Sequence, residues 1–174
     1  MRLSGSTGIG AFTVVLGIGG VIASAYIYRV PSRPAWNTPF TLVAFHLTSA
    51  TLGPLFAAAV AAGDARWLGV ATATMAGAQL ITLALRFFQL SASDAIELRA
   101  SATLLATTLA SRLVLRGALL GVGAIALPLF SSRPVVLWAA FFLALAGETL
   151  GRYLFFVSAV PKHMAAAYLG SEAA

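Results

Sequence analysis

Two charged residues interrupt the last hydrophobic run of the chain. Residues 135–160 read VVLWAAFFLALAGETLGRYLFFVSAV, which is long enough to cross a bilayer, yet they include Glu148 and Arg152. A charge in hydrocarbon costs from about 3 to more than 10 kcal/mol, which makes such residues candidates for a functional site. Because four positions separate them, they lie on one helix face and can pair. Gly147 and Gly151 share this spacing, which lets a neighbouring backbone approach closely.

The composition places the chain in a membrane. Of its 174 residues, 60% are hydrophobic and only 9% are charged, and the mean hydropathy is +0.93. Spans in lipid must be helices or a closed barrel, and apolar runs without two-residue alternation favour helices. The chain has no cysteine, which excludes iron–sulfur clusters and structural zinc sites that are ligated by thiolates. Its net charge of +6 suits anionic lipid or an acidic partner, and nothing favours nucleic acid.

We predict an all-α integral membrane bundle of five transmembrane helices in one domain that covers residues 1–174. The spans are expected at about 9–28, 38–62, 67–90, 113–130 and 135–160. Residues 91–112 are rich in serine, threonine and charge, so they are expected to form a polar loop that carries a surface helix. The first span is rich in glycine, which favours close helix packing.

Basic residues are distributed unevenly between the two sides of the membrane. We call the side of the amino terminus side X and the opposite side Y. Side Y then carries Arg29, Arg33, Arg99, Arg112 and Lys162, and side X carries Arg2, Arg66 and Arg133. The positive-inside rule favours a cytoplasmic side Y, but contact with a partner subunit would also account for this asymmetry. The first four residues on side Y are therefore candidates for partner docking.

The ionisable residues within the spans all fall in the half nearer to side Y. At 1.5 Å per residue, Arg86 lies roughly 30 Å from the side X end of its helix, and Arg116 lies in the first turns of a helix that begins at side Y. Glu148, Arg152 and His46 have similar depths. Together they predict a polar pocket for a lipophilic ligand with a polar head, or a proton path. The alternative is that the arginines only snorkel to the head groups.

His46 is the only histidine within a predicted span, since His163 lies in the tail. A haem would need two axial ligands at matching depth, so we expect no haem, and we expect no metal in this chain. His46 is expected to line a pocket or to pack between helices. Trp36, Trp67 and Trp138 all fall at helix boundaries and are expected to be interface anchors.

Three segments resemble the membrane anchor subunit of dimethyl sulfoxide reductases. They are ASAYIYRVPSRPAWN at 23–37, FHLTSATLGPLF at 45–56 and LAGETLGRYLFFVSAVPKHM at 145–164. In this resemblance Arg116, Glu148 and Arg152 match family positions, whereas His46 stands where a family member can carry an apolar residue. Anchors of this family have eight spans and no haem. They tether a molybdopterin catalytic subunit and an iron–sulfur subunit, and they oxidise membrane quinol.

The resemblance covers only the last five of those eight spans, and residues tied to quinol binding in the family lie largely in the other three. It implies a natural short form, a fragment, or a chain that works beside another membrane subunit supplying the remaining spans. It also implies menaquinone or ubiquinone as a diffusible substrate and the bacterial inner membrane as the location. The chain itself would hold no redox centre, and catalysis would belong to the partner subunits.

Three functions remain open from the sequence. The first is an electron-transfer anchor of a molybdopterin oxidoreductase complex. The second is a scaffold or assembly subunit without quinone chemistry. The third is a small transporter with Glu148 as a proton site, although no repeat of broken helices supports it.

Overall fold

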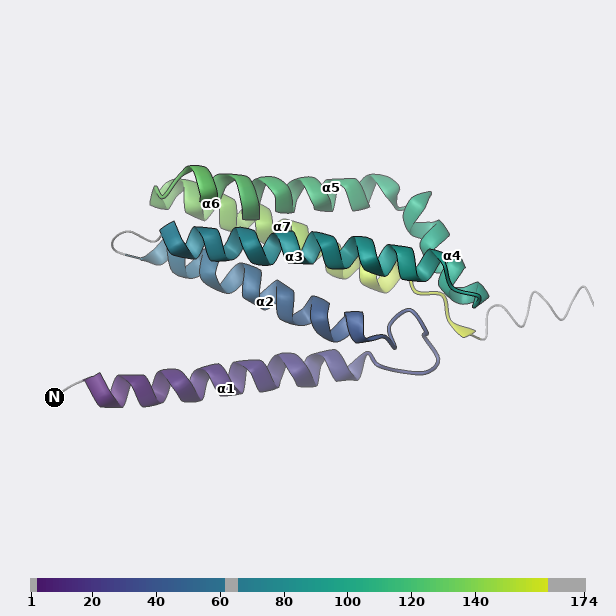
Figure 1. Cartoon of the computed structure of the whole chain (residues 1–174), viewed down its shortest axis with the longest axis horizontal. Coiled ribbons are helices and arrows are strands. Elements are labelled where there is room, and N and C mark those ends of the chain that lie inside the picture. The colour runs from purple at the N-terminus through teal and green to yellow at the C-terminus, as the bar shows by residue number, and fades with distance from the viewer. Residues whose placement is uncertain (1–2, 62–65, 163–174) are drawn as a thin grey trace, which may run out of the picture.

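The computed structural model describes residues 3–61 and 66–162. Within these ranges five helices are long and apolar enough to cross a membrane, and no strand occurs. The prediction of an all-α bundle with five transmembrane helices is confirmed. Figure 1 shows the helices running in alternating directions, with the segment before α2 and the segment after α3 at the same end of the molecule. That end corresponds to side Y.

The helices begin and end close to the expected positions, with one larger difference. The elements are α1 (Leu3–Ile27), α2 (Pro39–Val60), α3 (Arg66–Ser91), α4 (Ile96–Ala106), α5 (Ala110–Leu120), the π-helical η1 (Gly121–Ala126), α6 (Leu127–Phe130) and α7 (Pro134–Val157). The fourth span runs through α5, η1 and α6 without interruption. Residues 91–112, expected as a polar loop with a surface helix, are mostly helical, because α4 buries Ser101, Ala102 and Leu105 and α5 already begins at residue 110.

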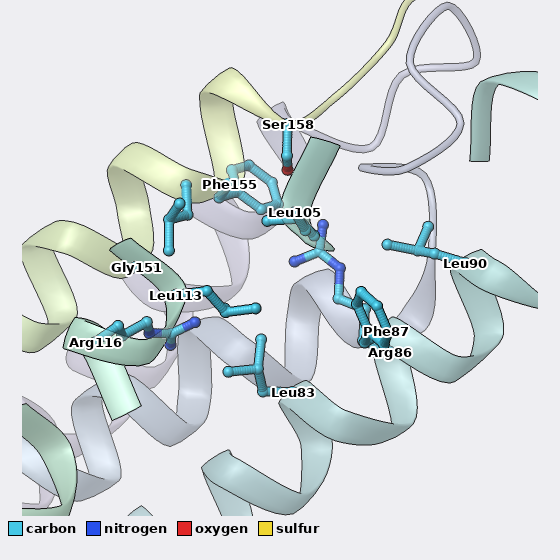
Figure 2. Close-up of a pocket in the computed structure, with 11 residues that line it drawn as sticks. Leu83, Arg86, Phe87, Leu90, Leu105, Leu113, Arg116, Gly151, Phe155 and Ser158 are labelled. Atoms are coloured by element: carbon cyan, nitrogen blue, oxygen red, sulfur yellow. The ribbon is translucent and has the colours of Figure 1, made fainter. Parts of the chain in front are cut away.

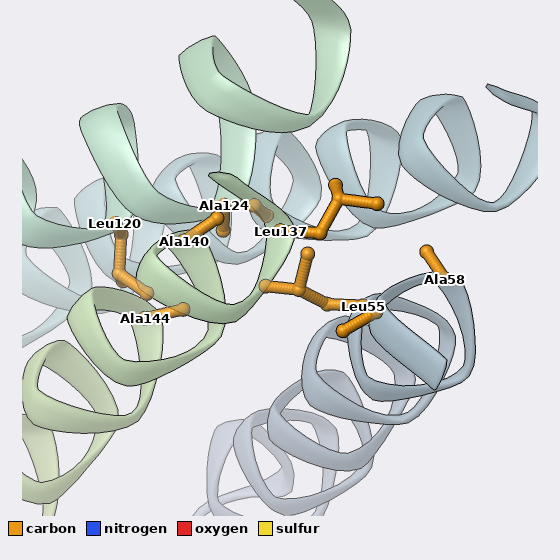
Figure 3. Close-up of a cluster of buried hydrophobic side chains, with 9 residues drawn as sticks. Leu55, Ala58, Leu120, Ala124, Leu137, Ala140 and Ala144 are labelled. Atoms are coloured by element: carbon orange, nitrogen blue, oxygen red, sulfur yellow. The ribbon is translucent and has the colours of Figure 1, made fainter. Parts of the chain in front are cut away.

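Small side chains form the centre of the bundle. The cluster in Figure 3 brings Leu55 and Ala58 of α2 against Leu120 and Ala124 of the fourth span and against three residues of α7. The α7 residues are Leu137, Ala140 and Ala144. Alanine allows helix axes to approach closely. The resulting van der Waals packing stabilises the bundle, because helices in lipid lack a hydrophobic driving force for association.

The closest backbone contacts occur at two glycines that the sequence did not single out. A Cβ at Gly69 of α3 would lie 2.5 Å from the carbonyl oxygen of Pro128. A Cβ at Gly123 of η1 would lie 2.7 Å from the backbone nitrogen of Ala144 and 2.9 Å from the carbonyl oxygen of Ala140. Pro128, two residues after the end of the π-helical η1, has no N–H to donate to the carbonyl oxygen of Ala124.

Helix α1 lies apart from the other spans (Figure 1) and packs mainly against α2. Only 6% of its apolar window is buried, compared with 33% for α7. No atom lies within 4 Å of a Cβ built at Gly10, Gly17, Gly19 or Gly20. The expectation that these glycines serve close packing is therefore wrong within residues 3–61 and 66–162, because no helix of these ranges covers them.

Aromatic residues tie the side Y loop to the end of α7. Trp36 Nε1 donates a hydrogen bond of 2.8 Å to the carbonyl oxygen of Phe155, and the two rings are stacked at 5.4 Å. Trp138 packs at the other end of α7, where its ring contacts Phe56. Both tryptophans are thus structural contacts as well as boundary residues, whereas Trp67 is 69% exposed, as an interface anchor would be.

Candidate functional site

Five polar side chains from four helices meet inside the side Y half of the bundle. We call them the polar cluster: Thr48 of α2, Arg86 of α3, Arg116 of α5, and Glu148 and Arg152 of α7. The antiparallel arrangement brings the starts of α2 and α5 beside the ends of α3 and α7, and each of these residues lies in the side Y part of its helix. The structure therefore brings together four of the five site residues expected from the sequence.

Glu148 is the most deeply buried member of the cluster, with 4% of its surface exposed. Thr48 Oγ1 lies 2.7 Å from Glu148 Oε2 and donates a hydrogen bond to it. Arg152 Nη2 donates to the same hydroxyl over 3.4 Å, so Thr48 links the carboxylate to the guanidinium. Among the described residues Glu148 forms no direct ion pair, although it interacts electrostatically with Arg116 and Arg152. Glu148 Oε1 is buried without a hydrogen-bond partner.

Arg116 occupies the space that a glycine leaves open. A Cβ at Gly151 would lie 2.5 Å from Arg116 Nε and 2.6 Å from its Cζ, so the guanidinium lies directly on the α7 backbone. Gly147, one turn earlier, contacts the side chains of Leu119 and Leu120. The two glycines of α7 thus admit side chains of α5, and the expected close approach of a neighbouring backbone is not found there.

Arg86 anchors the side Y end of α3. Its Nη2 donates a hydrogen bond of 3.1 Å to the carbonyl oxygen of Ala35, and its guanidinium lies 5.2 Å from the ring centre of Phe155. Figure 2 shows Arg86 and Arg116 extending from their helices into one pocket, with Gly151 and Phe155 on its α7 side. The Nε atoms of both arginines are buried and have no hydrogen-bond partner.

Two cavities adjoin the cluster, and each has a volume of about 30 Å³. Both are lined by Arg86, Arg116, Gly151 and Phe155, and only the second is also lined by Glu148 and Arg152. A space of this size holds about one water molecule, which would need two to four polar partners. The unpartnered atoms of the cluster supply such partners, but an aromatic ring does not fit.

Positive charge predominates in the polar cluster. Its three guanidinium groups outnumber its one carboxylate by two, and Arg116 lies close enough to repel both Arg86 and Arg152. The face of Arg152 covers the ring of Phe45, with Cζ 3.6 Å from the ring centre. Such cation–π contacts compensate a buried cation in part, by about 2 kcal/mol or more when water is excluded.

His46 stands outside the polar cluster. Its Nδ1 lies 2.9 Å from the carbonyl oxygen of Leu42 on its own helix, so the ring is engaged in a local contact. His46 lines neither of the two cavities. His163, the other histidine, lies outside the described residues.

The four docking candidates divide into two kinds. Arg33 Nη1 donates to the carbonyl oxygen of Ala159 over 3.2 Å, and Arg29 lies 5.3 Å from the ring centre of Tyr26, so both contribute to the chain's own packing. Arg99 and Arg112 are exposed on side Y, and Arg112 also lies 5.5 Å from the ring centre of Tyr153. The second pair therefore presents the more accessible charge.

Sequence reasoning missed Thr48 and the specific role of Gly151. Threonine is common in transmembrane helices, where it usually bonds to its own backbone, and Thr48 Oγ1 indeed also lies 3.0 Å from the carbonyl oxygen of Ala44. The only available signal was its position two residues after His46, at the depth of Glu148 on an antiparallel helix. A second missed contact is the buried pair of Thr51 and Gln79, whose side-chain oxygens lie 3.4 Å apart.

Five apolar helices around a cationic interior cluster define a multi-pass integral membrane protein. A family model described as DMSO reductase anchor subunit (DmsC) matches residues 7–157, and the chain belongs to this family. Comparison with curated proteins and with solved structures gives no match. Family membership makes the chain a membrane anchor of a DMSO reductase-type complex, whose partners are a catalytic subunit and an iron–sulfur subunit.

Proposed function

We propose that this chain tethers a molybdopterin catalytic subunit and an iron–sulfur subunit to the bacterial inner membrane and passes electrons between membrane quinol and the iron–sulfur subunit. The observation that carries the proposal is the family match over residues 7–157, together with the five membrane-spanning helices. The quinone, menaquinone or ubiquinone, is a diffusible substrate. The chain supplies no redox centre, and the reduction of the terminal substrate takes place in the partner.

The polar cluster is the best candidate for contact with the quinol head group. It lies in the side Y half of the bundle, and among the described residues that line the two cavities Glu148 is the carboxylate that could accept a proton from a quinol. Because each of the two cavities has a volume of only about 30 Å³, the ring would bind at the edge of the cluster, together with a partner subunit. Arg116, Arg152 and Arg86 would stabilise negative charge that develops when the quinol loses protons.

A scaffold function without quinone chemistry is the second candidate. The small size of the two cavities favours it, since a cluster with little free space also fits a purely structural role. In that case the arginines and Glu148 would hold α2, α3, α5 and α7 in register. Electron transfer would then use surfaces supplied by other subunits.

Docking of the iron–sulfur subunit is proposed for side Y, where Arg99 and Arg112 are exposed. Charge reversal of both, Arg99→Glu with Arg112→Glu, should lower the amount of iron–sulfur protein that co-purifies in mild detergent. Arg133→Glu is the matched control, because Arg133 is also exposed but lies on side X. Equal loss of partner in the double variant and the control would place docking elsewhere.

The electron-transfer function itself is tested in the purified complex. The complex should oxidise a quinol analogue, and reduce the terminal substrate with its electrons, only when this chain is present. If the complex assembles normally with this chain, but the partner subunits oxidise quinol equally well without it, the result would support the scaffold function instead. A chain that purifies with no iron–sulfur or molybdenum protein would contradict both functions.

A further inference from the structure

An open groove runs between α1 and the rest of the bundle. We call it the α1 groove; its volume is about 620 Å³, and it is lined on the α1 side by Gly17, Gly20, Val21 and Ser24. These four residues recur at helical spacing, so they form one face of α1. Since Cβ atoms at the two glycines would meet nothing within 4 Å, the groove is an open surface facing the membrane, and it is much larger than the two cavities of the polar cluster.

The side Y end of the α1 groove carries a single charge. Arg152 lines it together with Tyr28 and Ser49, and no carboxylate is among the described residues that line it. One face of the guanidinium is covered by Phe45, and its one hydrogen bond, to Thr48, is long at 3.4 Å. The remaining N–H groups of Arg152 are therefore available to a ligand in the groove.

The side chain of Arg152 can reach the depth of a lipid phosphate. Helix α7 has 24 residues and is thus about 36 Å long, slightly more than the ~30 Å of hydrocarbon in a bilayer. Arg152 lies five residues before the end of α7, or about 7.5 Å along the axis, and its long side chain can reach the head groups. The groove continues from this point toward the membrane centre along Gly20 and Gly17.

We propose that the α1 groove binds one glycerophospholipid with an anionic head group. Its phosphate accepts hydrogen bonds from Arg152 and from the hydroxyl of Tyr28, which already lies near this guanidinium. One acyl chain lies over Gly17 and Gly20 and fills the gap that leaves α1 almost unburied. The lipid thereby joins α1 to the bundle, and its negative charge offsets part of the cationic excess of the polar cluster. The inference is independent of whether the chain handles quinol.

The test fills the groove without touching a charge. Gly17→Leu and Gly20→Leu each place a side chain into the groove, whereas Gly19→Leu, on the same exposed helix but not lining the groove, is the matched control. The full complex is purified with each variant, exchanged into detergent with palmitoyl-oleoyl phosphatidylglycerol or phosphatidylethanolamine, and analysed by native mass spectrometry. Arg152→Gln tests the head group separately.

We expect one retained phosphatidylglycerol per wild-type and Gly19→Leu chain, and loss of that lipid in the Gly17→Leu and Gly20→Leu variants. Phosphatidylglycerol should be preferred about fivefold, the factor given by ~1 kcal/mol for one basic residue near anionic lipid, and Arg152→Gln should abolish this preference. The proposal would be overturned if all glycine variants retained the lipid equally or if both lipids bound equally. It would also be overturned if the Gly17→Leu and Gly20→Leu variants lost a co-purified quinone or partner helix in place of the lipid.

Discussion

Removal of the Glu148 carboxylate is the most direct perturbation of the polar cluster. Glu148 is 4% exposed and is the only acidic residue among the described residues that line either cavity, so Glu148→Ala leaves Arg116 and Arg152 without this counter-charge. Removing one of two buried, interacting charged groups typically costs about 3–5 kcal/mol, because the other charge is left uncompensated. We expect the free energy of unfolding to fall by this amount and the yield of assembled complex to fall with it.

Two milder substitutions separate the parts of this effect. Glu148→Gln keeps the shape and an acceptor for Thr48 but loses the charge, so it should cost about 1–3 kcal/mol. Thr48→Val removes the 2.7 Å hydrogen bond to Glu148 Oε2 and should cost about 1.5–3 kcal/mol, the range for hydrogen bonds to charged groups. Combined, the two should cost less than the sum, because Glu148→Gln already removes the charge that strengthens the hydrogen bond lost in Thr48→Val.

The control for the threonine substitution is Thr149→Val. Thr149 is exposed and donates only to the carbonyl oxygen of Leu145 in its own helix, at 2.8 Å. Its replacement should change stability by no more than about 0.5 kcal/mol. The measurement is unfolding in mixed micelles with increasing fractions of denaturing detergent, followed by circular dichroism, alongside the yield of complex in membranes.

The same variants distinguish a structural cluster from a redox-linked one. If Glu148 accepts quinol protons, Glu148→Gln should assemble yet oxidise a quinol analogue slowly. If the cluster is structural, the assembled fraction should oxidise quinol at the wild-type rate. Wild-type stability and assembly of Glu148→Ala, or equal effects of Thr48→Val and Thr149→Val, would refute the reasoning.

Three further predictions concern packing and cofactors. Gly123→Ala should destabilise the bundle by about 1–3 kcal/mol because its Cβ meets the α7 backbone, whereas Gly121→Ala, which meets nothing within 4 Å, should be neutral or stabilising in an unfolding titration. Trp36→Phe should cost about 1 kcal/mol or more in the same titration through loss of the hydrogen bond to α7, while Trp67→Phe, at 69% exposure, should cost little. The reduced complex should show no haem absorption that depends on His46; a band lost in His46→Ala would contradict this.

The sequence by itself determined the number of spans and the depth of each polar residue. Both follow from local properties, because a run of about 20 apolar residues spans the bilayer wherever it occurs and depth advances by 1.5 Å per residue. The placement of Arg86, Arg116 and Glu148 in the side Y half needed no knowledge of neighbours. The residues of α4 were harder to assign, since a short amphipathic helix is stabilised mainly by what it packs against.

Only the tertiary structure decided which faces meet. Helix depth says nothing of rotation about the axis, so the sequence did not reveal that Thr48 stands between Glu148 and Arg152 or that Gly151 admits the guanidinium of Arg116. The glycines of α1 and of α7 look alike in sequence, yet Cβ atoms at those of α1 would meet nothing within 4 Å among the described residues, while Gly151 is in tight contact. Glycine permits close approach, but a neighbouring helix must be present at that face to use it.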